Sequence, residues 1–413
     1  MMATLALPAR YYDVDRANRR ASAIFVHLAL IGCICLQRFA FYVAGSPVYF
    51  CLPIFLALIV WMVATGRAEF RPIPLAWFTL FAAIGLASAL VAAYWPDLRI
   101  LDTSPASLIL VLALYCGLTI RPGPAFSADR TLAIFVFYAR LCAVLGIAQY
   151  LVQFVGFQFF SFMLAIPALK PILVEPLFNY QPWVAYGSTT LRSNGFFLVE
   201  PSIFSQLLML AVVVEYFVLR RWRFLPVYGV AYIFTYAGTG LLALWLACAL
   251  YLLTLPRDAG RIVTFTIVAA VLAGIGSLVF PDQLASLTGR ASELSYSGTS
   301  ANARYMTQFG MIDAVAGETR TLIGYGPGAL ERAQFYVPGG SSPTLKLYID
   351  YGILGLLAFW TFFTGAIWRR ETAIVACFML VNFQLGGGNL LFEPLIILTA
   401  IVCIWSSPAR RTA

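Results

Sequence analysis

Two segments of the chain together supply arginines and a carboxylate, a combination that suits phosphate chemistry. In the first segment, Arg192 lies eight residues before Glu200, and Pro201 follows directly. Arg304 lies in the second segment. Guanidinium groups bind phosphate oxygens through paired hydrogen bonds and stay charged at any physiological pH, and a carboxylate can take a proton from a hydroxyl. We therefore predict Glu200, Arg192 and Arg304 as catalytic residues.

Glu200 also has a structural interpretation. Pro201 suits the first position of a helix, because that position does not use its N–H group. A carboxylate just before a helix is stabilised by the helix dipole. Glu200 is thus either a helix-start residue or a functional residue at the membrane surface. In the second case it acts as a base or as the partner of an arginine.

The composition predicts where these segments must lie. The chain is 61% hydrophobic and 11% charged, whereas soluble domains are nearer a quarter charged. We expect an all-α polytopic membrane protein with residues 1–413 in one integral membrane domain and about twelve transmembrane helices. The expected spans are 22–37, 46–65, 74–95, 104–120, 131–155, 201–219, 224–237, 240–256, 262–280, 347–367, 372–387 and 390–406; the seventh and eighth meet at a break, 236–240.

The arginines predict the orientation. Most of them flank the spans on one side, which the positive-inside rule assigns to the cytoplasm. This places both termini in the cytoplasm, with residues 1–21 as a cytoplasmic N-terminal segment. The formal charge of +9 is then largely an orientation signal and does not indicate nucleic-acid binding. The arginines that agree are Arg10, Arg16, Arg19, Arg20, Arg67, Arg71, Arg121, Arg130, Arg220, Arg221, Arg223, Arg257, Arg261, Arg369, Arg370, Arg410 and Arg411.

Two long external loops, 156–200 and 281–346, carry positive charge on the opposite side. Such charge is against the positive-inside rule, and an anionic partner on the outer face explains it most simply. We therefore predict Arg320 and Lys346 as substrate-binding residues. The cationic residues of the two loops are Lys170, Arg192, Arg290, Arg304, Arg320, Arg332 and Lys346.

The second loop contains further signals. Apolar residues at helical spacing predict a helix within 299–316, on which Arg304 and Gln308 share a stripe. The run 324–328, Gly-Tyr-Gly-Pro-Gly, predicts a tight turn, or a backbone nest around Gly326 that binds an anion. Lys346 and Asp350 are four residues apart, as in a surface ion pair or as two substrate-binding groups.

Arg140 lies near the middle of a predicted span, where a charge is costly and usually has a partner. Glu215 and Glu393 are the other acids within the spans, so Arg140 either pairs with one of them or binds a ligand. Asn382, Gln384 and Asn389 flank the glycines at 386–388 and either line an external cavity or bond between helices. The chain has one histidine and eight cysteines, all within or at the edges of apolar runs, so we predict no metal site and no cofactor.

Several of these residues together resemble the motif pattern of a known protein family. The pattern of Arg192, then 200–202 (Glu-Pro-Ser), then Arg304, then Gly324-x-Gly326-x-Gly328, then 352–355 (Gly-Ile-Leu-Gly) is similar to that of the bacterial O-antigen ligase/Wzy polymerase superfamily. The resemblance implies an enzyme of the bacterial inner membrane. Its external arginines would bind the undecaprenyl diphosphate of a donor oligosaccharide, without metal or nucleotide sugar, and the glycosidic bond would form with inversion.

One departure favours a polymerase of O-antigen, capsule or exopolysaccharide repeat units. Ligases of the superfamily carry a histidine followed by Asn, Ser or Gln, and then nine residues before the Gly-x-x-Gly; this chain has Ser341 and Ser342 at those two positions. The alternatives are a ligase that transfers the glycan to lipid A-core and, from another class, a flippase or other secondary transporter. Expected partners besides the lipid-linked glycan and membrane lipids are a chain-length regulator and a flippase.

Overall fold

The structure is a computed structural model that describes residues 9–43, 46–157, 166–174, 183–184, 188–255, 259–268, 302, 306–336 and 341–406. It is 70% helical, which confirms the all-α class. Its α-helices are α1 (Ala9–Leu30), α2 (Cys51–Ala64), α3 (Pro72–Tyr94), α4 (Pro105–Tyr115), α5 (Thr131–Val152), α6 (Pro201–Val212), α7 (Leu225–Ile233), α8 (Thr239–Thr254), α12 (Thr307–Asp313), α13 (Pro343–Ile367), α14 (Ala373–Leu385) and α15 (Glu393–Thr399).

Shorter elements extend or join these helices. The π-helical segments η1 (Ile31–Cys35), η7 (Val213–Val218) and η14 (Ala400–Ile404) continue α1, α6 and α15. The 3-10 turns are η2 (Cys116–Thr119), η3 (Gln153–Val155), η5 (Pro167–Ile172), η10 (Thr319–Leu322), η11 (Leu330–Arg332), η12 (Arg370–Thr372) and η13 (Asn389–Leu391). Two antiparallel pairs, β1 (Ala40–Val43) with β2 (Ser46–Tyr49) and β3 (Ala68–Phe70) with β4 (Ile120–Pro122), are additions that the sequence did not predict.

Among the described residues, five helices are long and apolar enough to cross a membrane: Asp15–Cys35, Pro72–Tyr94, Thr131–Val155, Pro201–Val218 and Pro343–Ile367. They correspond to the first, third, fifth, sixth and tenth predicted spans. Five shorter apolar helices of 10–17 residues accompany them, so the total of about twelve spans stays a prediction.

Two local predictions are confirmed. The seventh and eighth spans meet at a break, since α7 ends at Ile233 and α8 begins at Thr239, with Tyr236 at a φ of 48° between them. The second loop contains a helix where its apolar spacing predicts one, because α12 lies within 299–316. The predicted span 262–280 lies outside the described residues beyond residue 268.

Segments that are predicted to be cytoplasmic meet at one end of the bundle. Arg67 Nε donates to Asn18 Oδ1 at 3.1 Å, which joins the end of α2 to the start of α1. Arg71 donates through Nη1 to the carbonyl of Ala366 at 2.6 Å, near the end of α13. Their clustering agrees with one shared side; which side of a membrane this is remains a prediction from the charges.

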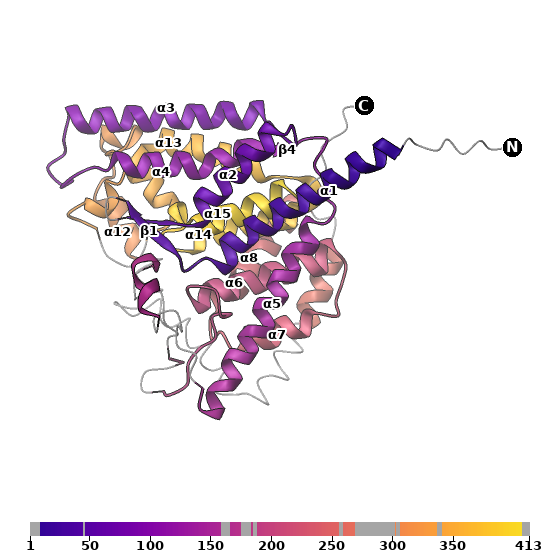
Figure 1. Ribbon diagram of the computed structural model, residues 1–413. Helices are drawn as coiled ribbons and strands as arrows, with labels where there is room; N and C mark the ends of the chain where they lie inside the picture. The colour runs from indigo at the N-terminus through magenta and orange to yellow at the C-terminus, as the bar shows by residue number, and fades with distance from the viewer. Residues whose placement is uncertain are drawn as a thin grey trace.

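The helix α13 is central to the fold. It packs against α3, which runs along the outer edge of the bundle in Figure 1. Its aromatic side chains pack against neighbouring helices: the ring centroids of Phe359 and Tyr115 are 4.9 Å apart in an edge-to-face arrangement, and those of Phe363 and Phe383 are 4.7 Å apart. This buried cluster fixes α13 between α4 and α14.

Gly352 breaks the helical geometry of α13 near its start. Its φ is 68° and its ψ is −173°, a combination that is essentially restricted to glycine. A Cβ at this position would lie 2.4 Å from the carbonyl carbon of Leu322. The kink therefore lets the second predicted external loop (281–346), called the second external region from here on, approach the α13 backbone closely.

We predict that Gly352→Ala destabilises the fold by at least about 1 kcal/mol, because both the backbone angle and the contact forbid a side chain. The control is Gly365→Ala in the same helix, where nothing lies within 4 Å of an added Cβ. Thermal unfolding of the purified protein in detergent measures both. Equal melting temperatures for the two variants would contradict the prediction.

Candidate functional site

The segment that carries Arg192 and Glu200 is fastened to α5 by one buried amide. The Oε1 atom of Gln149 accepts hydrogen bonds from the backbone N–H groups of Asn194 (3.2 Å) and Phe196 (3.3 Å) and from Ser193 Oγ (3.1 Å). Its Nε2 atom donates to Asn194 Oδ1 at 3.0 Å. Gln149 therefore holds the segment at the predicted external end of α5.

The same segment is strained. Phe196 has a φ of 71°, which is uncommon for a residue with a side chain. Such a conformation costs about 1–3 kcal/mol and persists only where its surroundings enforce it. The hydrogen bond from Phe196 to Gln149 is part of that enforcement, together with Gly195, which also has a positive φ of 70°. Strain of this kind is typical of functional sites.

The outer end of the first span holds the other end of the segment. Gln37 Oε1 accepts from the Val199 N–H at 3.0 Å. Arg38 donates to the Leu198 carbonyl through Nε at 3.2 Å and through Nη2 at 2.9 Å. Arg38 is only 1% exposed, and this burial lowers its pKa to about 10, so it keeps its charge at neutral pH.

The sequence analysis missed Arg38. It follows an apolar run on the predicted external side, so the same charge count that singled out Arg192 could have found it.

Glu200 lies where the helix-start interpretation puts it, directly before α6. Its side chain makes no capping bond to the backbone. Instead it accepts a hydrogen bond from Ser202 Oγ at 2.6 Å and is half-buried. Arg192 donates through Nη2 to the Val184 carbonyl at 2.9 Å. Glu200 therefore occupies the helix-start position, but its carboxylate does not cap the helix.

A narrow cavity borders this segment between η1, α6, α14 and α15. Leu198 and Ile203, on either side of Glu200, contribute to its wall. Most of the wall is apolar, with four amide side chains. The complete lining is Cys33, Ile34, Gln37, Leu198, Ile203, Gln206, Leu207, Leu210, Asn382, Asn389, Phe392, Pro394, Leu395 and Leu398. Asn382 and Asn389 thus line a cavity, the first role predicted for them. Bonding between helices, the second role, is also present: Asn389 Nδ2 donates to the carbonyls of Asn382 and Phe383 in α14, and Gln384 of α14 bonds to Thr344 of α13.

Ser341, one of the two serines at the position where the resemblance would place a ligase histidine, lies close to this cavity. The Ser341 carbonyl accepts from the Gly388 N–H at 3.1 Å, and Gly388 directly precedes the cavity residue Asn389. Ser342 Oγ donates to Gln308 Oε1 at 2.5 Å and accepts from the Leu345 N–H at 3.3 Å. Gln308 belongs to the stripe predicted for Arg304, which itself lies outside the described residues.

The glycine run 324–328 forms a nest, and the chain fills it. Gly324, Gly326 and Gly328 all have positive φ. The N–H groups of Gly328 and Leu330 donate to the two oxygens of the Asp350 carboxylate, at 2.9 and 3.0 Å. Gly326 itself donates to the Asp350 carbonyl at 3.1 Å. The anion in the nest is therefore Asp350.

Lys346 and Asp350 form an ion pair, as the first of their two interpretations predicted. The surface location that this interpretation gave the pair is wrong, because the pair is buried. Their atoms Nζ and Oδ2 are 2.8 Å apart, and their side chains are 4% and 0% exposed. Lys346 also contacts Glu331 at 2.6 Å. In this arrangement Gly326, Lys346 and Asp350, predicted as substrate-binding residues, bind one another and the backbone.

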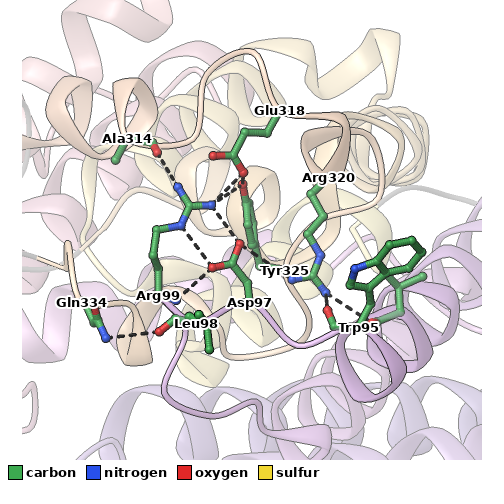
Figure 2. Close-up of polar contacts among 10 residues, drawn as sticks. Trp95, Asp97, Leu98, Arg99, Ala314, Glu318, Arg320, Tyr325 and Gln334 are labelled. Atoms are coloured by element: carbon green, nitrogen blue, oxygen red, sulfur yellow. Dashed lines mark hydrogen bonds and ion pairs between the residues drawn. The ribbon is translucent and has the colours of Figure 1, made fainter.

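A second ionic network joins the α3–α4 loop to the second external region (Figure 2). Arg99 contacts Asp97 at 2.9 Å and Glu318 at 2.7 Å. Tyr325 donates to Glu318. Arg320 Nη1 lies 3.9 Å from Asp97 Oδ2. Its Nη2 donates to the carbonyls of Val91 and Trp95, at the end of α3. Arg320, predicted as substrate-binding, therefore joins two parts of the protein; Arg99 was not singled out from the sequence.

Arg140 forms the first of its two predicted arrangements. Its Nε donates to Glu215 Oε1 at 2.9 Å, and its guanidinium lies 3.6 Å from the ring centroid of Phe224. Glu215 is fully buried. The pair compensates two charges inside the bundle.

Comparison with known proteins gives no matching family, no curated relative and no similar solved structure. The resemblance to the O-antigen ligase/Wzy polymerase superfamily thus stands on the motifs alone. Within the described residues, no group of three or more His, Cys, Asp or Glu side chains has metal-binding geometry.

We predict that Asp350→Ala is strongly destabilising, by about 3–5 kcal/mol, because it removes one of the two carboxylates that pair with the buried Lys346 and leaves two N–H groups unpaired. The control is Asp15→Ala, which removes the exposed pair of Asp15 with Arg19 and costs less than about 1 kcal/mol. Chemical unfolding in detergent compares them. A small, equal loss in both would show that the nest does not depend on Asp350.

The ionic network predicts a pH dependence. The side-chain hydrogen bonds from Arg99 lower the pKa of Asp97 and of Glu318. A carboxyl group with a lowered pKa stabilises the fold above its unfolded pKa of about 4 and loses this as pH falls through the lowered value. The exchange rate of the amides of residues 313–336, relative to that of unprotected amides at the same pH, should therefore rise below about pH 4. The rise should be smaller in Glu318→Gln, and an identical profile would contradict the assignment.

Proposed function

We propose that this protein is a glycosyltransferase of the bacterial inner membrane. It joins oligosaccharide repeat units that are linked to undecaprenyl diphosphate, on the periplasmic face, and so polymerises O-antigen, capsule or exopolysaccharide. The observation that carries the proposal is the strained segment from Arg192 to Glu200, which buried groups of α5 and the first span hold beside the cavity. Strained backbone of this kind clusters at functional sites.

The reaction needs a base and an anion-binding group. Glu200 takes the proton of an acceptor sugar hydroxyl, and its half-buried position gives access from the outside. The hydroxyl oxygen attacks the anomeric carbon of the donor as the bond to the diphosphate breaks on the opposite face, which inverts the configuration.

The departing diphosphate carries the negative charge. Arg192 and Arg304 stabilise it electrostatically, because guanidinium forks match phosphate oxygens. Energy arrives with the donor, so no nucleotide takes part. The bilayer holds the lipid tails of donor and acceptor, which brings both to the same height.

The residues at 341–342 favour polymerisation over ligation. Ser342 is engaged with Gln308 and with the start of α13, and neither serine is the histidine that the resemblance leads one to expect in a ligase. A ligase that uses lipid A-core as acceptor is therefore the second outcome that an experiment must distinguish.

We predict that Arg192→Ala, Arg304→Ala and Glu200→Gln each abolish polymer formation while the protein still inserts. Arg192→Lys should also fail, since lysine cannot bind two phosphate oxygens in parallel. The control is Arg16→Ala, an exposed residue of the N-terminal segment. Purified variants in liposomes receive undecaprenyl-diphosphate-linked repeat units without nucleotide or metal, and the products are separated on a gel.

A ladder of longer lipid-linked glycans from the unsubstituted protein and Arg16→Ala, and none from the other variants, supports the proposal. Transfer only after lipid A-core is added would make the protein a ligase. Full activity of Arg192→Ala, Arg304→Ala and Glu200→Gln would overturn the site. If neither product forms, a lipid-flipping assay with the same liposomes tests the transporter alternative.

A further inference from the structure

The loop between α3 and α4 has two different faces. On one side Ile100 packs against the small hydrophobic cluster that contains Tyr325 and Leu345. On the other side Trp95, Leu98 and Leu101 are 78%, 93% and 74% exposed. Three large apolar side chains in seven residues thus point away from the protein.

The loop cannot turn these side chains inward, because its backbone is bonded to the second external region. The Leu101 N–H donates to the Arg332 carbonyl at 3.0 Å, and the Arg99 carbonyl accepts from the Gln334 N–H at 2.9 Å. The Ser104 N–H donates to the Pro327 carbonyl at 2.7 Å. Burial of one such side chain is worth about 1.5–3 kcal/mol, so a fixed patch of three needs apolar surroundings outside the chain.

The neighbouring helix indicates what those surroundings are. The helix α3 is one of the five that are long and apolar enough to cross a membrane. Its last turns expose Leu86 (56%), Leu90 (58%) and Tyr94 (87%). The patch continues this face directly beyond the helix end, and tryptophan and tyrosine are enriched where a bilayer meets water.

We propose that Tyr94, Trp95, Leu98 and Leu101 form an interfacial anchor that inserts into the headgroup boundary of the lipid bilayer. Its partner is the lipid surface itself, and the anchor is independent of the proposed glycosyl transfer. An annular phospholipid satisfies it, and no recognition of a particular headgroup is needed.

The anchor sets the height of the second external region. Arg320 donates to the carbonyls of Val91 and of the anchor residue Trp95 (Figure 2). Arg99, in the same loop as the anchor, binds Glu318. The depth at which Trp95 sits in the lipid therefore fixes where 318–328, with its glycine nest, lies above the membrane.

The test is a measurement of depth at Leu98, whose 93% exposure makes substitution harmless to folding. Leu98→Cys is labelled with an environment-sensitive dye in liposomes that contain nitroxide-labelled lipids. The unsubstituted protein, labelled in parallel, corrects for its own cysteines. The matched control is Thr319→Cys, an exposed polar position of the second external region.

We expect a blue-shifted emission at position 98 that headgroup-proximal nitroxides quench, and an unshifted, unquenched emission at position 319. Equal emission at both positions would overturn the proposal. So would an unquenched label at 98 that becomes shielded only in native membranes, because a partner protein would then cover the patch. Neither outcome depends on polymer formation, so failure here leaves the proposed function standing.

Discussion

The burial of Asp350 is the constraint on which the predicted external half of the protein depends. A carboxylate with no exposed surface is costly unless it is paired and hydrogen-bonded. Here Lys346 and the N–H groups of Gly328 and Leu330 meet that need. Because these donors come from the glycine run and from α13, their bonds close the second external region onto the start of that helix. Gly352 makes the approach possible by carrying no side chain at a positive φ.

A similar logic holds the segment from Arg192 to Glu200, although with neutral groups. Gln149 and Gln37 lie at the ends of apolar helices and use their carbonyl oxygens to bind backbone N–H groups of the segment. Each of these bonds is buried, so losing one leaves an unpaired donor at a cost of about 1–3 kcal/mol. The positions of the two candidate residues are thus set by side chains that have no chemistry of their own.

Much of this arrangement is local and could be predicted. Proline at the first helical position marks the starts of α3, α4, α6 and α13, as its missing N–H group leads one to expect. The cost of charge in a membrane predicted that Arg140 either pairs with Glu215 or Glu393 or binds a ligand, and the structure has the pair with Glu215.

The burial of the Lys346–Asp350 pair could not be predicted. Spacing along a helix gives the pair, whereas its burial depends on a loop about twenty residues earlier that folds over it. Arg38 and Arg99 went unnoticed for a different reason, since each is the single cation of a short predicted external turn.

The internal acids change the interpretation of the cationic external loops. Arg99, Arg320 and Lys346 each lie within ion-pair distance of a carboxylate of the chain. Part of the anionic partner that this charge requires is therefore supplied by Asp97, Glu318 and Asp350. Arginines and lysines committed in this way would have to give up charged partners before they could bind a diphosphate, at a cost of several kcal/mol for buried pairs. Arg320 and Lys346 are therefore better understood as groups that hold the predicted external region in place.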